Sequence, residues 1–458
     1  MVEARDSVAS PEAPATAALR RRVAALGERL GTLVNRRRVR AYSAIVLVVV
    51  VLEYGFVFLT GPGLLDRFGQ IKGTDFIQFY VAGQLIAAGR GAELYGFELP
   101  FRFPVQFEAQ TQLLMPQSAE HRHAYVVPPF YALLFVPLSQ LPYVPAYGVW
   151  AALNVGLLFA ALRVLRPHFA VLQGDDSGIA HLAVFSFFPF LECLFDGQNS
   201  VVTLFLFAAA YAALRRHRDA IAGVTLGLAL YKPQLVGVMA LFLLASRRWR
   251  AIVGLAGMGL LLAAISYAVV GPRGVADYVE LAATMPGWIY LPGWRTWNMH
   301  SWNSLFVLLF PGPGLSQALT LAAVLVTLTF LALAWRSSAH DALGFDLGFA
   351  LAVLGTLLIS PHVFAYDLLL LVMPGLALAS LLVAQPAIAL TAVVARLRTL
   401  LALAYLAPLV SRFAAMWLHV QVSVLVLAAM FAATYLLATR PVVRSALVQS
   451  SAPLSGSA

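Results

Sequence analysis

The segment AYSAIVLVVVVLEYGFVFLT (41–60) decides the class of fold. It holds a single charged residue, Glu53, and a helix that crosses a bilayer needs about 20 predominantly apolar residues. The run is too long for the apolar core of a secretory signal. Residues 1–40 before it are polar and Arg-rich, so we expect no cleavable signal peptide. We predict a first membrane span at 41–60, with its N-terminal side in the cytoplasm.

The composition of the whole chain supports the same class. Hydrophobic residues make up 61% and charged residues 11% of the 458 positions, against about 45–50% and about 25% in soluble domains. A soluble protein would expose much of that apolar surface to water, whereas a bilayer covers it. We predict an all-α polytopic membrane protein with about 10–13 transmembrane helices, some of them broken or re-entrant. The single Cys193 excludes an internal disulfide framework and a Cys-based zinc site.

The formal charge of +10 does not indicate a nucleic-acid partner, because the basic residues form short clusters between apolar runs. This is the positive-inside pattern of cytoplasmic loops. If all clusters are cytoplasmic, the runs 126–142 and 220–246 each enter and leave the membrane on one side. Both contain helix breakers, Pro128–Pro129 in the first and Pro233 in the second. We therefore predict hairpins or broken helices there.

The chain divides into three predicted parts. Residues 1–40 form a cytoplasmic Arg-rich tail, 41–440 a transmembrane domain, and 441–458 a disordered cytoplasmic tail. Within the domain, the polar stretch 61–124 is a first external loop with amphipathic helices near 75–90 and 104–115. The same orientation places three more polar segments outside, namely DGQNS (196–200), the Trp-rich loop 271–300 and SPHVFAYD (360–367). Segment 301–310 is short and ends in PGPG, so it need not span.

Asp75 lies in KGTDFIQFY (72–80), shortly after the first span. Its neighbours Phe76, Phe79 and Tyr80 recur at helical spacing, which favours an amphipathic helix along the membrane interface. Asp75 stands at the start of this helix, so its side chain could simply be an N-cap. Alternatively, it is a general base that takes a proton from a hydroxyl group above the membrane.

Lys232 is the most unusual residue, because it lies in the apolar run LALYKPQL (228–235). A cation at membrane depth costs at least about 2.5–3.5 kcal/mol on insertion scales, so it normally faces a cavity or a partner. An anionic lipid phosphate is one ligand that such a cavity would bind. The alternative is a structural ion pair, for which Asp196, Glu192 and Glu53 are the candidate partners.

The other external segments offer polar side chains with two possible roles. In SPHVFAYD, His362 and Tyr366 would share a helix face beside Asp367, either to contact substrate or to form an interfacial belt. Gln198 and Asn199 either bind sugar hydroxyls or satisfy frayed helix ends. The spacing of these residues gives a weak metal signal, and we predict no metal site.

The loop PGWIYLPGWRTWNMHSWNS (286–304) is rich in aromatic side chains. Trp294 and its neighbours either stack on sugars or belong to the aromatic belt of a membrane protein. Arg295 is the candidate phosphate ligand of this loop, and His300 is a further polar candidate.

Taken in order, five motifs resemble glycosyltransferase family 87, membrane transferases of the GT-C class. The resemblance covers roughly 45–440 and rests on GTDFIQFY (73–80), VVPPFYALLFVPL (126–138), GQN (197–199), KP (232–233) and SPH with YD (360–367). It implies a GT-C-like bundle in a bacterial plasma membrane, with the active site facing the exterior. No nucleic acid and no cofactor are implied.

The resemblance also implies a reaction. A polyprenyl-phosphate sugar is the donor, a glycolipid or polysaccharide is the acceptor, and the anomeric carbon is inverted with Asp75 as base. The basic positions offered to the donor phosphate are Lys232, His362 and Arg295. Those offered to the sugar and acceptor are Gln198, Asn199, Tyr366, Asp367, Trp294 and His300. The first loop lacks an adjacent second acid and the last motif a second His, so mannose and arabinofuranose both remain open.

A transporter or flippase with a midplane site at Lys232 is the competing hypothesis, because broken helices form such sites. The long external loop 61–124 with Asp75 favours the transferase, since a transporter does not need it.

Overall fold

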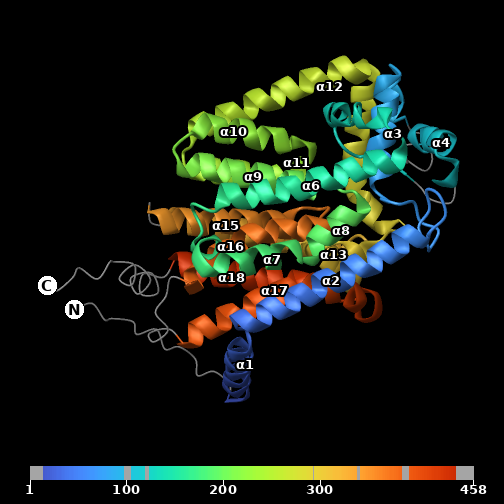
Figure 1. Cartoon of the computed structure of the whole chain (residues 1–458). Helices are drawn as coiled ribbons and strands as arrows, with labels where there is room; N and C mark the ends of the chain where they lie inside the picture. The colour runs from blue at the N-terminus through green and yellow to red at the C-terminus, as the bar shows by residue number, and fades with distance from the viewer. Residues whose placement is uncertain are drawn as a thin grey trace.

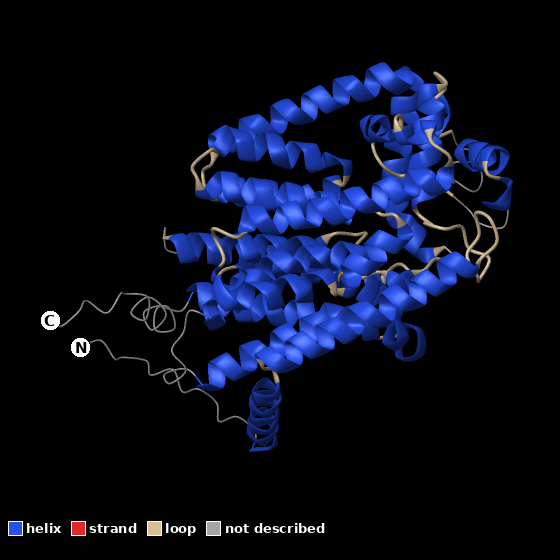
Figure 2. Ribbon diagram, viewed as in Figure 1, coloured by secondary structure: helices blue, strands red, loops and turns tan. Residues whose placement is uncertain are grey.

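The computed structural model describes residues 14–96, 105–118, 123–291, 293–337, 341–383 and 391–439. Within these ranges every regular element is a helix, and the extended backbone forms only isolated bridges. Figure 2 shows this helical architecture, with short loops joining the helices. The predicted tail at 441–458 and residues 1–13 of the N-terminal tail lie outside the described residues.

The described part contains eight helical segments that are long and apolar enough to cross a membrane. They are built from α2 (Arg36–Thr60), α6 (Tyr143–Leu165), α12 (Trp249–Thr284), α14 (Leu315–Ser337), α15 (Ala342–Ile359), α16 (Val372–Val383), α17 (Thr391–Leu418) and α18 (Val422–Thr439). The prediction of an all-α polytopic membrane protein is confirmed.

Among the described residues, part of the expected 10–13 helices are short or broken. Besides the eight long segments, α7 (Ser177–Phe185) and α8 (Phe188–Asp196) form a pair bent by 47° that counts as one further span at most. The apolar runs 200–214 and 220–246 instead form three shorter helices, α9 (Ser200–Arg215), α10 (Asp219–Leu228) and α11 (Pro233–Ala245). Neighbouring helices can cover such short segments, so they need not match the bilayer thickness.

The predicted helix breaks are present. The run 220–246 is interrupted at Lys232, between the 3-10 turn Ala229–Tyr231 and Pro233 at the start of α11. The run 126–142 divides into α5 (Pro129–Ala132) and two 3-10 turns. Segment 301–310 contributes only α13 (Trp302–Leu309), whose eight residues are too few to span.

The helix after Asp75 differs from its prediction. Helix α3 (Phe76–Ala87) is buried along eight of its twelve residues, so it is not an amphipathic helix lying on the interface. Aromatic rings cover it on several sides. Phe79 stacks on Phe135 with ring centroids 4.8 Å apart, and Phe76 lies edge-on to Tyr147 at 5.7 Å. Helix α4 (Val105–Leu114), by contrast, buries Phe107 and Thr111 and leaves other residues exposed, as an amphipathic helix does.

The N-terminal part of the chain packs on the bundle. Helix α1 (Pro14–Leu33) contacts α17, where Thr399 Oγ1 donates to the Gly27 carbonyl at 2.6 Å and Arg396 pairs with Glu28 at 2.7 Å. Helix α2 begins at Arg36, so the last residues of the predicted tail form its first turn. Figure 1 shows α1 at one end of the bundle and α3 with α4 at the opposite end.

Helices α10 and α12 approach closely at a glycine, which gives a test of the packing. A Cβ atom at Gly223 would lie 1.9 Å from the carbonyl oxygen of Ala251, so Gly223→Ala forces two backbones apart and should cost about 1–3 kcal/mol. Gly237→Ala in α11 is the matched control, because nothing lies within 4 Å of its added methyl group. Thermal unfolding in detergent measures both, and equal midpoints for the two variants would contradict the close approach.

Candidate active site

Two segments that are distant in sequence meet at Asp75. The Asp75 N–H donates to the Asp196 carbonyl at 2.9 Å, and Thr74 Oγ1 donates to Asp196 Oδ1 at 3.3 Å. Gly197 ends α8 with a left-handed φ of 72°, and a Cβ there would lie 2.5 Å from Phe76 Cβ. A glycine is therefore required where DGQN (196–199) turns beside the start of α3.

The side chain of Asp75 does not cap α3. Asp75 occupies the N-cap position, yet its side chain makes no capping hydrogen bond. Instead, Gln198 Nε2 donates to Asp75 Oδ2 at 2.7 Å. The capping alternative is wrong for this side chain, and Gln198 holds the carboxylate in one orientation.

The environment of Asp75 favours proton acceptance. The residue is partly exposed in a mostly buried surrounding. Burial raises the pKa of Asp75 above its ordinary value, while the Gln198 hydrogen bond and the positive charge of Arg295 act in the opposite direction. A raised pKa makes a carboxylate a stronger base, provided that it is ionised at the working pH.

Lys232 forms a buried ion pair, but with none of the three expected acids. Its Nζ lies 2.6 Å from Asp367 Oδ1 and 3.0 Å from Ser200 Oγ, and 5.2 Å from the ring centre of Tyr366. Ser200 Oγ also donates to Asp367 Oδ1 at 2.6 Å. Lys232 was predicted to bind the donor phosphate and Asp367 the sugar or acceptor. In the structure their charges neutralise each other in one hydrogen-bonded network.

The break at Lys232 lies beside the other motifs. Tyr231 Oη is 2.6 Å from Thr203 Oγ1 and donates to the Asn199 carbonyl at 3.1 Å. Its ring stacks on Tyr131 of the Pro-rich run at 4.2 Å. The KP, GQN and PP motifs therefore meet in the folded chain, although sequence alone gave only their order.

The two predicted histidines lie on paired backbone segments. The His300 N–H donates to the Val363 carbonyl at 2.7 Å, and Met299 forms a bridge with Phe364. Burial lowers the pKa of His300 to about 3 and that of His362 to about 4, so both rings are neutral near neutral pH. His362 can offer an N–H group to a phosphate, but not a positive charge.

The Trp-rich loop places Arg295 without an ion pair to another described residue. Arg295 is exposed, and its charge acts on both Asp75 and Asp196. Trp294 faces a different environment, since it packs edge-on to Trp288 at 5.6 Å and its Nε1 lies 3.3 Å from Met299 Sδ. These contacts hold Trp294 in place, and its predicted contact with a sugar stays a prediction.

Two contacts were not predicted from the sequence, that of Asp196 with the segment carrying Asp75 and that of Ser200 with Lys232. A second carboxylate next to this segment thus comes from the end of α8 and not from the first loop. The signal was DGQNS itself, in which Asp196 precedes the amide pair, but no local spacing links it to residue 75.

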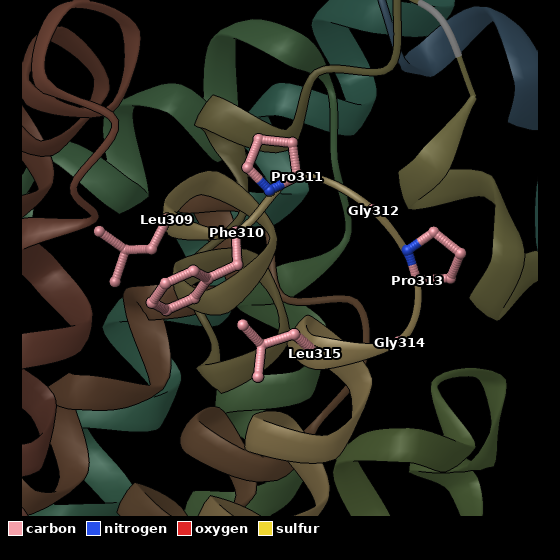
Figure 3. A pocket seen from close by; sticks show the side chains of 7 residues that line it. All are labelled: Leu309, Phe310, Pro311, Gly312, Pro313, Gly314 and Leu315. Atoms are coloured by element: carbon pink, nitrogen blue, oxygen red, sulfur yellow. The ribbon is translucent and has the colours of Figure 1, made fainter.

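Two further features do not add to this site. A surface hollow is lined by Leu309 to Leu315 around the PGPG turn, and it contains none of the predicted site residues (Figure 3). Within the part of the chain that the structure describes, no three His, Cys, Asp or Glu side chains are grouped so as to hold a metal ion.

The buried ion pair gives a test by a double-mutant cycle. Lys232→Met leaves Asp367 buried without its cation and should cost about 3–5 kcal/mol of stability. The double variant with Asp367→Asn should cost less than the sum of the two single changes. Unfolding in detergent measures the cycle, and Arg90→Gln, which breaks the more exposed Arg90–Glu93 pair, should cost far less than Lys232→Met. Additive single effects would contradict the pairing.

Comparison with known proteins agrees with the motifs. A model of glycosyltransferase family 87 matches residues 125–361, just over half of the chain. The polyprenol-phosphate-mannose-dependent alpha-(1-2)-phosphatidylinositol pentamannoside mannosyltransferase of Mycolicibacterium smegmatis is 24% identical over 368 residues, which cover 79% of this chain and 76% of that protein. The family match includes the PP, GQN and KP motifs, whereas Asp75, His362 and Asp367 lie outside it.

Proposed function

This chain belongs to glycosyltransferase family 87, and from that membership we propose the reaction that it catalyses. It transfers a sugar of the mannose type from a polyprenyl-phosphate donor to a lipid- or polysaccharide-linked acceptor, with inversion at the anomeric carbon. Mannose is favoured over arabinofuranose because the related protein is named for a mannose donor. The reaction takes place at the external face of a bacterial plasma membrane.

The contact between Gln198 and Asp75 carries this proposal. A carboxylate that leaves its own helix uncapped and is oriented by an amide is available for a substrate proton. In the proposed step, the acceptor oxygen gives its proton to Asp75 and bonds to the anomeric carbon. The bond from that carbon to the phosphate oxygen breaks, and the polyprenyl phosphate leaves with the electron pair.

The three basic positions predicted for the donor phosphate differ in what they offer. The charge of Lys232 is neutralised by Asp367, and the His362 ring is neutral. The exposed guanidinium of Arg295 forms no ion pair with a described residue. We therefore assign direct charge stabilisation of the leaving phosphate to Arg295, an N–H contact to His362, and positioning of the neighbouring segments to Lys232. No metal or cofactor is part of the proposed step.

The orientation in the membrane is argued from the two ends of the bundle. Helix α1 and the arginines at the start of α2 lie at one end, and α3, which follows Asp75, begins near the other (Figure 1). The positive-inside pattern assigns the arginine-rich end to the cytoplasm. This supports an external position for Asp75. A midplane transport site at Lys232 is disfavoured, because Lys232 is only 9% exposed and already paired.

Replacement of the proposed base tests the function. Asp75→Asn should fold and insert normally, yet lose about 10²–10⁴-fold in turnover, because the amide cannot accept the acceptor's proton. The assay follows sugar transfer from polyprenyl-phosphate mannose, with the arabinofuranose donor in parallel. Glu108→Gln in α4 is the control, since it changes a carboxylate of the same external loop. Sugar transfer by Asp75→Asn at the wild-type rate would contradict the assignment of Asp75 as the general base.

The pH dependence provides a separate test. Asp75 must be ionised to act, and burial raises its pKa, so activity should fall on acidification at a higher pH than for an ordinary carboxylate. Because the charge of Arg295 lowers the pKa of Asp75, Arg295→Gln should move this acidic limb to higher pH. The measurement is the pH profile of kcat/KM. If the acidic limb of the profile lies at the same pH in Arg295→Gln as in the wild type, it does not reflect the ionisation of Asp75.

A further inference from the structure

Arg412 is a cation near the end of a candidate membrane span. It lies in α17, within the apolar segment Val393–Leu418, and its side chain is exposed. Among the described residues it forms no ion pair, whereas Arg396 of the same helix pairs with Glu28 at 2.7 Å. A cation at such a depth is costly unless it is paired or reaches the interface. Arg412, exposed and near the end of this segment, is therefore open to an anion from outside the described chain.

Arg412 is fixed beside the loop that carries Arg295. Its guanidinium lies 4.5 Å from the ring centre of Trp297, two positions after Arg295. Gln421, between α17 and α18, donates through Nε2 to the Trp297 carbonyl at 3.0 Å. The stack and the hydrogen bond hold this loop against the external end of α17. Cation–π contact leaves the edge N–H groups of a guanidinium free for an anion.

The two arginines also share a position relative to the acids of the site. Both act electrostatically on Asp196, and Arg412 acts in addition on Glu192. Neither reaches a carboxylate within ion-pair distance in the described part. The acids are buried or partly buried while both guanidinium groups are exposed, so positive charge gathers on the outer side of an acidic interior.

We propose that Arg412 and Arg295 together bind the phosphate of a polyprenyl monophosphate, with Arg412 as a ligand that the sequence motifs do not include. Two guanidinium groups give a monoester phosphate charge-assisted, forked hydrogen bonds. On α17, Phe413 is 63% and Met416 46% exposed, and these apolar side chains flank Arg412 where a lipid tail would lie. The inference rests on the proposed function, because it assigns a binding site to the phosphate of the proposed donor.

Binding of the leaving lipid tests this without requiring sugar transfer. The full chain is placed in nanodiscs of phosphatidylcholine, and the dissociation constant of a radiolabelled polyprenyl monophosphate is measured. Arg412→Gln should weaken binding about 10- to 100-fold, as expected for the loss of a charged hydrogen bond. Arg412→Lys keeps the positive charge but loses the forked hydrogen-bond donors of a guanidinium. Its affinity should therefore lie between those of the wild type and Arg412→Gln. Arg398→Gln, at the other end of the same helix, is the matched control and should bind as the wild type does.

Each arm of the experiment has a defined consequence. Wild-type affinity in a folded Arg412→Gln or Arg412→Lys variant overturns the inference. So does displacement of the probe by phosphatidylglycerol or inorganic phosphate at equal concentration, since the site would then be a general anion site. In transfer assays, Arg412→Gln should raise KM for the donor but not for the acceptor. If the wild type itself binds no polyprenyl monophosphate, the proposed donor class fails, which is a different result.

Discussion

One backbone hydrogen bond, from the N–H of Asp75 to the carbonyl of Asp196, joins the two segments on which the site depends. It exists because Gly197 turns the chain at the end of α8 with a left-handed φ and leaves room for Phe76. The turn sets Gln198 next to the carboxylate, so its amide orients Asp75 without any rearrangement. The position of the proposed base thus follows from backbone geometry that a glycine permits and a side chain would obstruct.

The fold was predictable where its causes are local. An apolar run such as 41–60 identifies a span by its length alone, and Pro233 breaks a helix wherever it lies. The same local logic did not settle the number of long spans, because the apolar run 200–214 forms α9, a helix of sixteen residues that its neighbours largely bury. It also failed for α3, whose aromatic residues looked like one face of an interfacial helix. Phe135 and Tyr147 come from other elements and bury that helix.

The pairings within the site were beyond sequence reasoning for a related physical reason. An intramembrane lysine must find a partner, which the sequence did indicate, but the expected partners were Asp196, Glu192 and Glu53, and Asp367 was not among them. The choice of Asp367 depends on how the start of α9 meets the turn after His362. Ser200 contacts both members of the pair there. Such contacts are properties of the assembled bundle, and no spacing in the chain encodes them.

The distribution of charge connects these observations to the chemistry. Asp75, Asp196 and Glu192 share the interior, where like charges disfavour one another and a proton is accepted readily. An anionic lipid phosphate approaching that interior alone would be repelled. The guanidinium groups of Arg295 and Arg412 are exposed and act electrostatically on Asp196, so in the proposed complex they would compensate the phosphate charge near the carboxylates. This separation suits the proposed reaction, in which the proton goes to the carboxylate of Asp75 while the charge of the leaving phosphate develops beside the two arginines.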